Sequence, residues 1–218
     1  PYDDQRVMQI GSASVFSAIT MANAMIPMKG KGEFYANGGT SYKQSQANGF
    51  YRFPYQEEKL VAALHPYGFS PEIQTDIRDN FLTMGMRNEK NGWLLDLSVT
   101  SGRNALDFTV NNSNNASMGL SSPTTVYAGG FIYQQNLTNF DFSRKFEKVW
   151  FLKDFNLGGG SEFRIEQYEI IAGESASWMN GSDTTSDGSP KNAGIQVFPG
   201  FQPQNALKKN RTNFAAYA

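Results

Sequence analysis

The chain has 218 residues, a formal net charge of −1 and 18% charged residues, so it lacks the basic surplus with which proteins bind nucleic acid. It contains no cysteine, which excludes disulfides, thiolate metal sites and a cysteine nucleophile. No stretch approaches 18 consecutive apolar residues, so a transmembrane helix is not predicted. A membrane β-barrel stays compatible with this composition, because half of each strand faces a wet lumen.

The first two candidate elements lie in residues 16–43. The segment FSAITMANAM (16–25) fits a short helix or a strand. In residues 33–43 the even positions from Phe34 to Tyr42 are apolar or small, which predicts a β-strand with one apolar face. Phe34 and Tyr42 lie eight residues apart, roughly 26 Å along a strand or about 20 Å after a 40° tilt. That distance is near the spacing of the two aromatic girdles of a membrane barrel.

The clearest alternation follows in residues 93–100. Trp93, Leu95, Leu97 and Val99 are apolar, and the polar residues Asp96, Ser98 and Thr100 stand between them. Similar patterns occur in residues 80–88, 135–146, 155–167 and 210–218. Together these segments predict an all-β protein with about seven antiparallel strands.

The connections alternate between short and long. Short turns are expected near residues 27–32 and 88–92, a medium turn near residues 147–154, and long loops over residues 46–79, 103–129 and 169–209. Antiparallel strands joined in this way carry every long loop at one end of the sheet, as outer-membrane barrels do. Sandwiches of the immunoglobulin class can also sort their loops in this manner.

Several stretches resemble the β-barrel domain of Gram-negative TonB-dependent receptors. They are YANGGTSYKQSQANGFYRFP (35–54), HPYGFSPEIQTDIRDN (65–80), GWLLDLSVTSGRNALDFTVNNSNNASMGLSSPT (92–124), YAGGFIYQQNLTNFDFSR (127–144), GSEFRIEQYEIIAGESASW (160–178) and QVFPGFQPQNALKKNRTNFAAY (196–217). The resemblance implies an antiparallel transmembrane barrel of 22 strands with short periplasmic turns and long extracellular loops. Residues 1–218 would form part of that single barrel domain, because seven strands cannot close such a barrel alone. The plug domain and the remaining strands would lie outside this chain.

The resemblance also implies a function and a set of partners. We expect an outer-membrane receptor of a Gram-negative bacterium that takes up a scarce ligand: a siderophore, cobalamin, a saccharide or a peptide. The TonB complex would energise uptake through the plug, outer-membrane lipid would surround the barrel, and a surface lipoprotein is a further candidate partner. No enzymatic activity, cofactor, metal or nucleic acid is expected.

Three groups of residues follow from this reading. The residues expected to face lipid are Phe34, Tyr42, Trp93, Leu95, Leu97 and Val99. The polar residues expected to face the lumen are Asp96, Ser98, Asp141, Lys145, Glu162, Arg164 and Glu166. The residues expected to contact ligand, as parts of the extracellular loops, are Arg103, Asn104, Asp107, Tyr168 and Trp178.

Other motifs point to ordinary structural roles. His65 is the single histidine, and a zinc or catalytic site needs partners of defined geometry. Arg164 stands between Glu162 and Glu166 on one strand face, which favours a ladder of charges over acid–base chemistry. The main alternative function is a soluble or surface β-sandwich that binds ligand with its loops. A passive porin is a further alternative.

Overall fold

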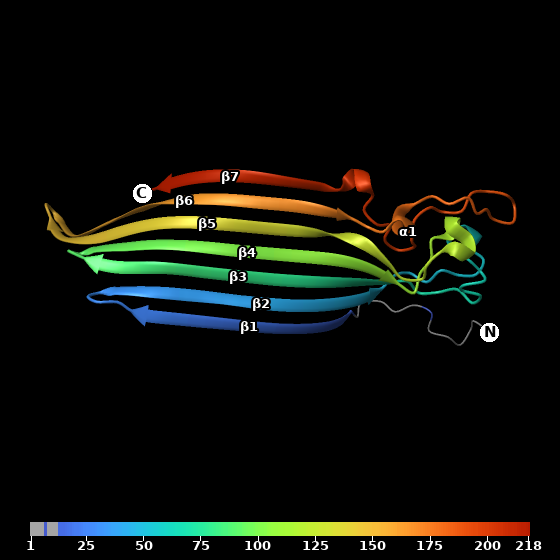
Figure 1. Ribbon diagram of the computed structural model, residues 1–218, viewed down its shortest axis with the longest axis horizontal. Coiled ribbons are helices and arrows are strands. Elements are labelled where there is room, and N and C mark those ends of the chain that lie inside the picture. The colour runs from blue at the N-terminus through green and yellow to red at the C-terminus, as the bar shows by residue number, and fades with distance from the viewer. Residues whose placement is uncertain (1–6, 8–12) are drawn as a thin grey trace.

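The computed structural model describes residues 7 and 13–218, and these form one antiparallel sheet in which β1 to β7 lie side by side in chain order (Figure 1). The strands are β1 (Ser14–Pro27), β2 (Gly32–Asn48), β3 (Glu72–Lys90), β4 (Trp93–Asn111), β5 (Val126–Val149), β6 (Leu152–Ala172) and β7 (Leu207–Tyr217). The all-β class and the seven strands are therefore confirmed. The segment 16–25, left open between helix and strand, belongs to β1. None of the described helices is long and apolar enough to cross a membrane.

The three tight turns lie at one end of the sheet, here called the turn end. They join β1 to β2, β3 to β4 and β5 to β6. In the middle turn, Asn91 and Gly92 have φ of 53° and 78° between the paired residues Lys90 and Trp93. Two successive residues of positive φ are what a two-residue hairpin of type I′ requires, and Asn-Gly is the sequence that best supplies them.

The three long connections lie at the other end, here called the loop end, and span residues 49–71, 112–125 and 173–206. They hold the short helices η1 (Glu57–Lys59), η2 (Ala116–Ser121), α1 (Ser175–Trp178) and η3 (Pro203–Asn205). Each connection is shorter than the sequence pattern predicted. The strands continue beyond their alternating segments because backbone hydrogen bonds, which do not depend on side-chain pattern, hold the ladder.

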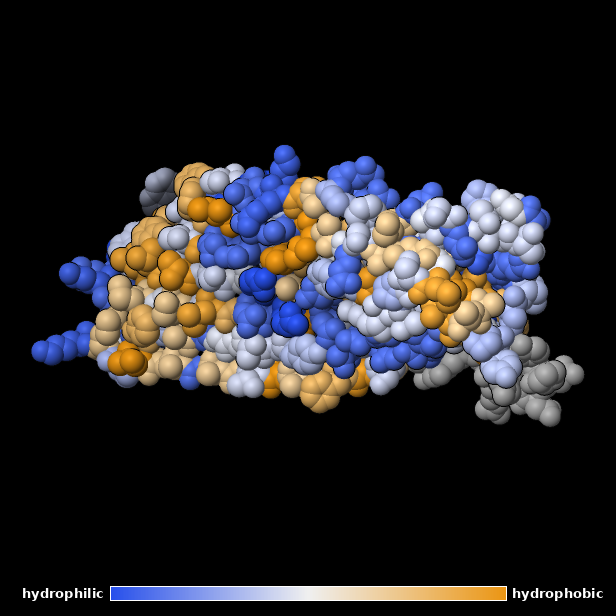
Figure 2. All heavy atoms as spheres, turned by 45° about the vertical axis from the view of Figure 1, so that its right-hand side comes forward, coloured by the Kyte–Doolittle hydropathy of each residue, from blue (hydrophilic) through white to orange (hydrophobic). Residues whose placement is uncertain are grey.

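The buried apolar cluster lies at the loop end and not under the middle of the sheet. It consists of Val110, Val126, Ala128 and Ile195, with Phe108 packed against it. A β-bulge between β4 and β5 lies next to this cluster, at Phe108. Over the middle of the strands both faces of the sheet are open, and in Figure 2 hydrophobic residues gather toward the turn end of the visible side.

Within the described residues, β1 and β7 form the two edges of the sheet and do not pair with one another. The sheet is therefore open, and no second sheet packs on it in this part of the chain.

Candidate functional site

The two faces of the sheet differ in chemistry, and the register assigns each residue to one of them. We call them the Leu97 face and the Asp96 face, after two neighbouring residues of β4. Pairing places Phe34, Met86, Leu97, Phe140 and Ser161 in one row across β2 to β6. Because side chains alternate along each strand, this row fixes the face of every other strand residue.

Two parallel lines of aromatic residues cross the Leu97 face obliquely. The lower line, nearer the turn end, runs from Phe34 on β2 through Trp93 to Phe155 on β6. The upper line joins Tyr42 on β2 to Phe163 on β6, and the strands between them carry no aromatic residue at this level. On β2 and on β6 alike the two lines are eight residues apart.

The slope of these lines can be calculated from the register. Phe34 shares a row with Ser161, which is six residues from Phe155 on β6 (161 − 155). The lower line thus moves about 20 Å along the strands while it crosses four strand spacings, about 19 Å. A line perpendicular to a barrel axis would have this slope if the strands were tilted by about 45°, close to the 35–45° of membrane barrels. At that tilt the two lines are about 20 Å apart.

The surface between the two lines is nearly free of charge. It carries Ala36, Gly38, Thr40, Asn80, Leu82, Met84, Met86, Leu95, Leu97, Val99, Ser101, Thr138, Phe140, Phe142, Leu157, Gly159 and Ser161, together with one cation, Arg144. Arg144 pairs with Trp93, so it stands at the lower line itself. The apolar side chains here remain open to the surroundings, and Leu97 is 46% exposed.

The Asp96 face is polar and internally hydrogen-bonded. The Tyr35 hydroxyl donates to Asp96 Oδ1 at 2.8 Å, and the Tyr217 hydroxyl donates to Asp141. Lys145 pairs with Asp154 at 3.1 Å. The two tyrosine hydrogen bonds each reach across an intervening strand, from β2 to β4 and from β7 to β5, and the ion pair joins the neighbours β5 and β6.

Glu166 is the centre of the largest polar network on this face. It is 6% exposed and accepts hydrogen bonds from the Tyr133 hydroxyl at 2.5 Å, Arg211 Nε at 2.8 Å and Asn213 Nδ2 at 2.8 Å. Arg164 adds an ion pair with Glu162 at 2.5 Å. The carboxylates are saturated by fixed donors, so this network is a structural ladder of charges with no free acid–base pair.

The loop end is a packed structure, and Asn114 and Asn115 tie its three connections together. Asn114 Oδ1 accepts from Val61 N at 3.1 Å, and its Nδ2 donates to Lys59 O at 3.0 Å. Asn115 Nδ2 donates to the carbonyls of Ala176 and Met179 at 3.0 and 2.9 Å. Both asparagines are 0% exposed. We call the joined connections 49–71, 112–125 and 173–206 the loop cluster.

The third connection folds over the Asp96 face at its loop end. Phe198 packs against Phe108 with ring centroids 5.0 Å apart, and Phe201 against Phe131 at 4.9 Å. Phe108 and Phe131 lie on the Asp96 face, opposite to the aromatic lines. The loop cluster therefore covers one end of the polar face and leaves the Leu97 face free.

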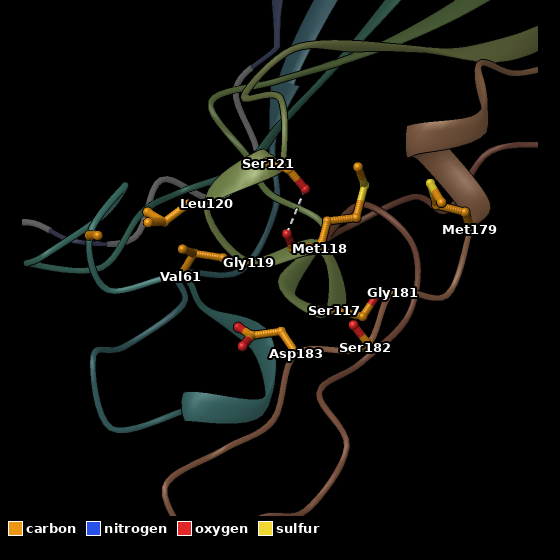
Figure 3. Close-up of a pocket in the computed structure, with 11 residues that line it drawn as sticks. Val61, Ser117, Met118, Gly119, Leu120, Ser121, Met179, Gly181, Ser182 and Asp183 are labelled. Carbon is orange, nitrogen blue, oxygen red and sulfur yellow. Dashed lines mark hydrogen bonds between the residues drawn. The ribbon is translucent and has the colours of Figure 1, made fainter.

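A pocket of about 530 Å³ opens in the loop cluster, and all three connections line it (Figure 3). Its lining residues are Val61, Ala63, Ser117, Met118, Gly119, Leu120, Ser121, Met179, Gly181, Ser182 and Asp183. One wall is polar: Ser117 Oγ accepts from Gly181 N at 2.8 Å, and Ser121 Oγ donates to Met118 O at 2.7 Å. The other wall is aliphatic, and Leu120 is 72% exposed there. The pocket combines apolar surface with a few fixed polar groups, as small-molecule sites do.

Two carboxylates of the loop cluster have lowered pKa values. The hydrogen bond from Lys191 Nζ, at 2.8 Å, lowers the pKa of Asp183 at the rim of the pocket. The hydrogen bond from the backbone N–H of Ser186, also 2.8 Å, lowers the pKa of Glu57 and joins the first connection to the third. Both groups are therefore charged at neutral pH.

The residues expected to face lipid and lumen fall on opposite faces. Phe34, Tyr42, Trp93, Leu95, Leu97 and Val99 share the Leu97 face, and Asp96, Ser98, Asp141, Lys145, Glu162, Arg164 and Glu166 share the Asp96 face. The register thus separates the two groups as expected.

The five expected ligand contacts do not come together. Arg103, Asn104 and Asp107 lie inside β4 and not in a loop, so that placement was wrong. Arg103 and Asp107 are on the Leu97 face, whereas Asn104 is on the Asp96 face. Tyr168 lies within β6. Trp178 is in α1, where Nε1 donates to Gly173 O at 3.2 Å.

None of these five residues lines the pocket. Near the loop end of β4 the apolar positions change from the odd residues 93–99 to the even residues Leu106, Phe108 and Val110, a strand signal that the sequence-based prediction did not use. The buried asparagines were missed because a run of Asn and Ser is typical of an exposed turn. His65, expected to be structural, stacks on Phe69 with ring centroids 4.3 Å apart.

The groups of metal-binding side chains that a metal site requires do not occur among the described residues. Comparison with protein-family models, with curated proteins and with solved structures gives no match to this chain.

Proposed function

We propose that this chain is part of the transmembrane barrel of a TonB-dependent outer-membrane receptor. The observation that carries the proposal is the oblique, nearly uncharged band of the Leu97 face between two aromatic lines. A soluble sheet has no reason to place Phe34, Trp93 and Phe155 on one line that slopes by about 45° across five strands, with Tyr42 and Phe163 eight residues from it on β2 and β6. A membrane barrel has such a reason, because amphipathic aromatic rings are most stable at the depth of the lipid headgroups.

In this proposal the Leu97 face contacts lipid and the Asp96 face lines the lumen. The charged networks around Asp96 and Glu166 then lie in water, where side chains of this kind are tolerated. Charges on the lipid side would cost about 2–4 kcal/mol at the midplane.

The open edges of β1 and β7 support a larger barrel. Unpaired backbone N–H and C=O groups in hydrocarbon cost several kcal/mol each, so only a closed barrel is stable there. Further strands must therefore pair with both edges. The total of 22 strands and the plug inside them rest on the resemblance to the receptor family.

The loop cluster would be the extracellular ligand-capture surface, and its pocket the first contact site. Uptake energised by TonB through a plug also rests on the resemblance. The single sheet disfavours the alternative of a β-sandwich module, because a sandwich needs a second sheet packed on the first.

The absence of cysteine allows a sharp test of the lipid and lumen assignment. Val99→Cys and Ser98→Cys place single thiols on the two faces of β4 at adjacent positions. In isolated outer membranes, a nitroxide on residue 99 should be accessible to dissolved oxygen, and one on residue 98 to a water-soluble nickel chelate. Equal accessibility at both positions would contradict the proposal.

The receptor assignment needs a second measurement, the intact mass of the native polypeptide in the outer-membrane fraction. A mass several-fold above the 24.2 kDa of this chain, with a plug-like region, is expected. A 24.2 kDa polypeptide in the soluble fraction would overturn the membrane proposal and favour a binding module.

A further inference from the structure

We infer that the turn-end edge of the Leu97 face binds the phosphate groups of anionic phospholipids, with Arg144 at the centre of the site; this inference rests on the membrane proposal above. Arg144 stands in one row with Lys90, Trp93 and Leu157. Its guanidinium carbon lies 5.5 Å from the ring centroid of Trp93 and 4.6 Å from that of Phe146. The two rings hold the cation at the lower aromatic line, which is headgroup depth in the membrane proposal.

The guanidinium of Arg144 has no acidic partner among the residues that the structure describes. No carboxylate of the described residues forms an ion pair with it. A planar guanidinium presents donors that match two phosphate oxygens at once. It is therefore a cation held in place whose counter-ion must come from outside this part of the chain.

Charges at the turn end are sorted by face. Lys90, Arg144 and Lys153 lie on the Leu97 face, as alternation along β3, β5 and β6 shows. The acidic strand residues of this region, Glu33, Glu89, Glu147 and Asp154, all lie on the Asp96 face.

Three of these acids already have partners: Glu33 pairs with Arg87, Glu89 with Lys31 at 2.7 Å, and Asp154 with Lys145 at 3.1 Å. Among the described residues, the Leu97 face at the turn end thus carries basic side chains and no acidic ones. This is the charge complement of an anionic headgroup layer.

Aromatic residues surround the cations on both sides along the strand direction. The lower aromatic line, where the acyl chains of the lipid would begin, has three phenylalanines on it or close to it: Phe142, Phe146 and Phe155. At the tip of the β5–β6 hairpin, Trp150 is 95% and Phe151 87% exposed. Exposed aromatic residues beside basic ones are typical of a surface in the headgroup region of a membrane.

At the loop end of the Leu97 face the charged residues are arranged differently. There Arg78 pairs with Asp107 at 3.1 Å, and Lys208 with Glu169 at 3.2 Å. Arg78 and Lys208 thus have carboxylate partners at the loop end, whereas Arg103 of the same face forms no ion pair within the described residues. What distinguishes the turn end is Arg144, a cation without an ion pair that lies over two aromatic rings, so the phospholipid site is assigned there and not around the whole barrel.

Native mass spectrometry of the native polypeptide in detergent tests the inference with added phosphatidylglycerol and phosphatidylcholine as probes. We expect tighter binding of phosphatidylglycerol. Each basic residue near a membrane surface is worth about 1 kcal/mol, or about fivefold in affinity. Arg144→Gln should therefore weaken phosphatidylglycerol binding about fivefold and leave phosphatidylcholine binding unchanged.

The control is Lys43→Gln, which removes an exposed cation of β2 from the Asp96 face and should change neither lipid. If Arg144→Gln fails to fold, the double variant Lys90→Gln and Lys153→Gln leaves the ring contacts of Arg144 intact and should weaken phosphatidylglycerol binding about 25-fold, from the same value per charge.

Three results would contradict the inference, and they separate the lipid site from the membrane proposal. Equal affinities for the two lipids, or equal effects of Arg144→Gln and Lys43→Gln, in a polypeptide that resides in the outer membrane would overturn the lipid site alone. A polypeptide recovered from the soluble fraction without detergent would overturn the membrane proposal and this site with it.

Discussion

Leu97→Arg places a charge near the middle of the proposed lipid-facing band. Leu97 is four residues from Trp93 on β4, about 14 Å along the strand and about 10 Å in depth at a tilt of 45°. The two aromatic lines are about 20 Å apart, so residue 97 lies close to the midplane. An arginine on the lipid face at this depth costs about 2–4 kcal/mol.

Ser98→Arg is the matched control, because it introduces the same side chain one residue away on the Asp96 face. Its row contains Asn139 and Glu162, and Asp96 precedes it by two residues on the same face. The new guanidinium would therefore lie in water near carboxylates, and we expect a cost below about 1 kcal/mol.

The difference is measured as the free energy of unfolding in guanidinium chloride of the native polypeptide inserted in lipid vesicles. Retention of a compact band in unheated electrophoresis serves as a check of folding for each variant. Equal destabilisation by the two substitutions would refute the assignment of lipid and lumen faces, whatever its size.

Three further predictions concern the loop cluster. Asn114→Ala leaves the buried backbone N–H of Val61 and the part-buried carbonyl of Lys59 without their partner, so it should cost about 2–4 kcal/mol of local stability. Hydrogen exchange in residues 112–125 should rise, whereas Thr125→Ala, at an exposed position of the same connection, should leave it unchanged. The interaction of Asp183 with Lys191 lowers the pKa of Asp183, so it stabilises the folded loop fully above the ordinary carboxyl pKa and is lost as the pH falls through the lowered value. Proteolysis of the loop cluster should therefore accelerate below about pH 4. Asp183→Asn should remove this acid-dependent acceleration. Phe201→Ala removes a half-buried ring from the aromatic cluster and should destabilise the third connection by about 2 kcal/mol, visible as faster exchange there with little change in the strands; unchanged exchange would show that the ring contacts do not hold this connection.

The alternating segments of β2 and β4 could be predicted from the sequence because each presents one apolar face. A period of two residues determines both the strand and the face to which each side chain belongs. In β4 the apolar residues Trp93, Leu95, Leu97 and Val99 accordingly lie on one face of the sheet and the polar residues Asp96 and Ser98 on the other, as the pattern predicted.

The loop end could not be predicted in the same way. Arg103, Asn104 and Asp107 were assigned to a loop because the apolar alternation of residues 93–99 stops before them and resumes on the opposite face at Leu106, Phe108 and Val110. The structure continues β4 through all three, since the neighbouring strands β3 and β5 supply hydrogen bonds that a single segment does not reveal. Asn114 and Asn115 give the opposite case: their composition is that of an exposed turn, yet contacts 53 and 61 residues away bury them.

The sequence by itself determined the strand class, the tight turns and the face of each alternating residue, because these depend on local periodicity and on residues such as Asn91 and Gly92 that favour one backbone geometry. Only the tertiary structure decided the slope of the aromatic lines, the sorting of turn-end charges between two faces and the pocket formed by three connections. These features depend on register between strands that are distant in sequence, and register is set by the pairing of whole strands rather than by any one of them.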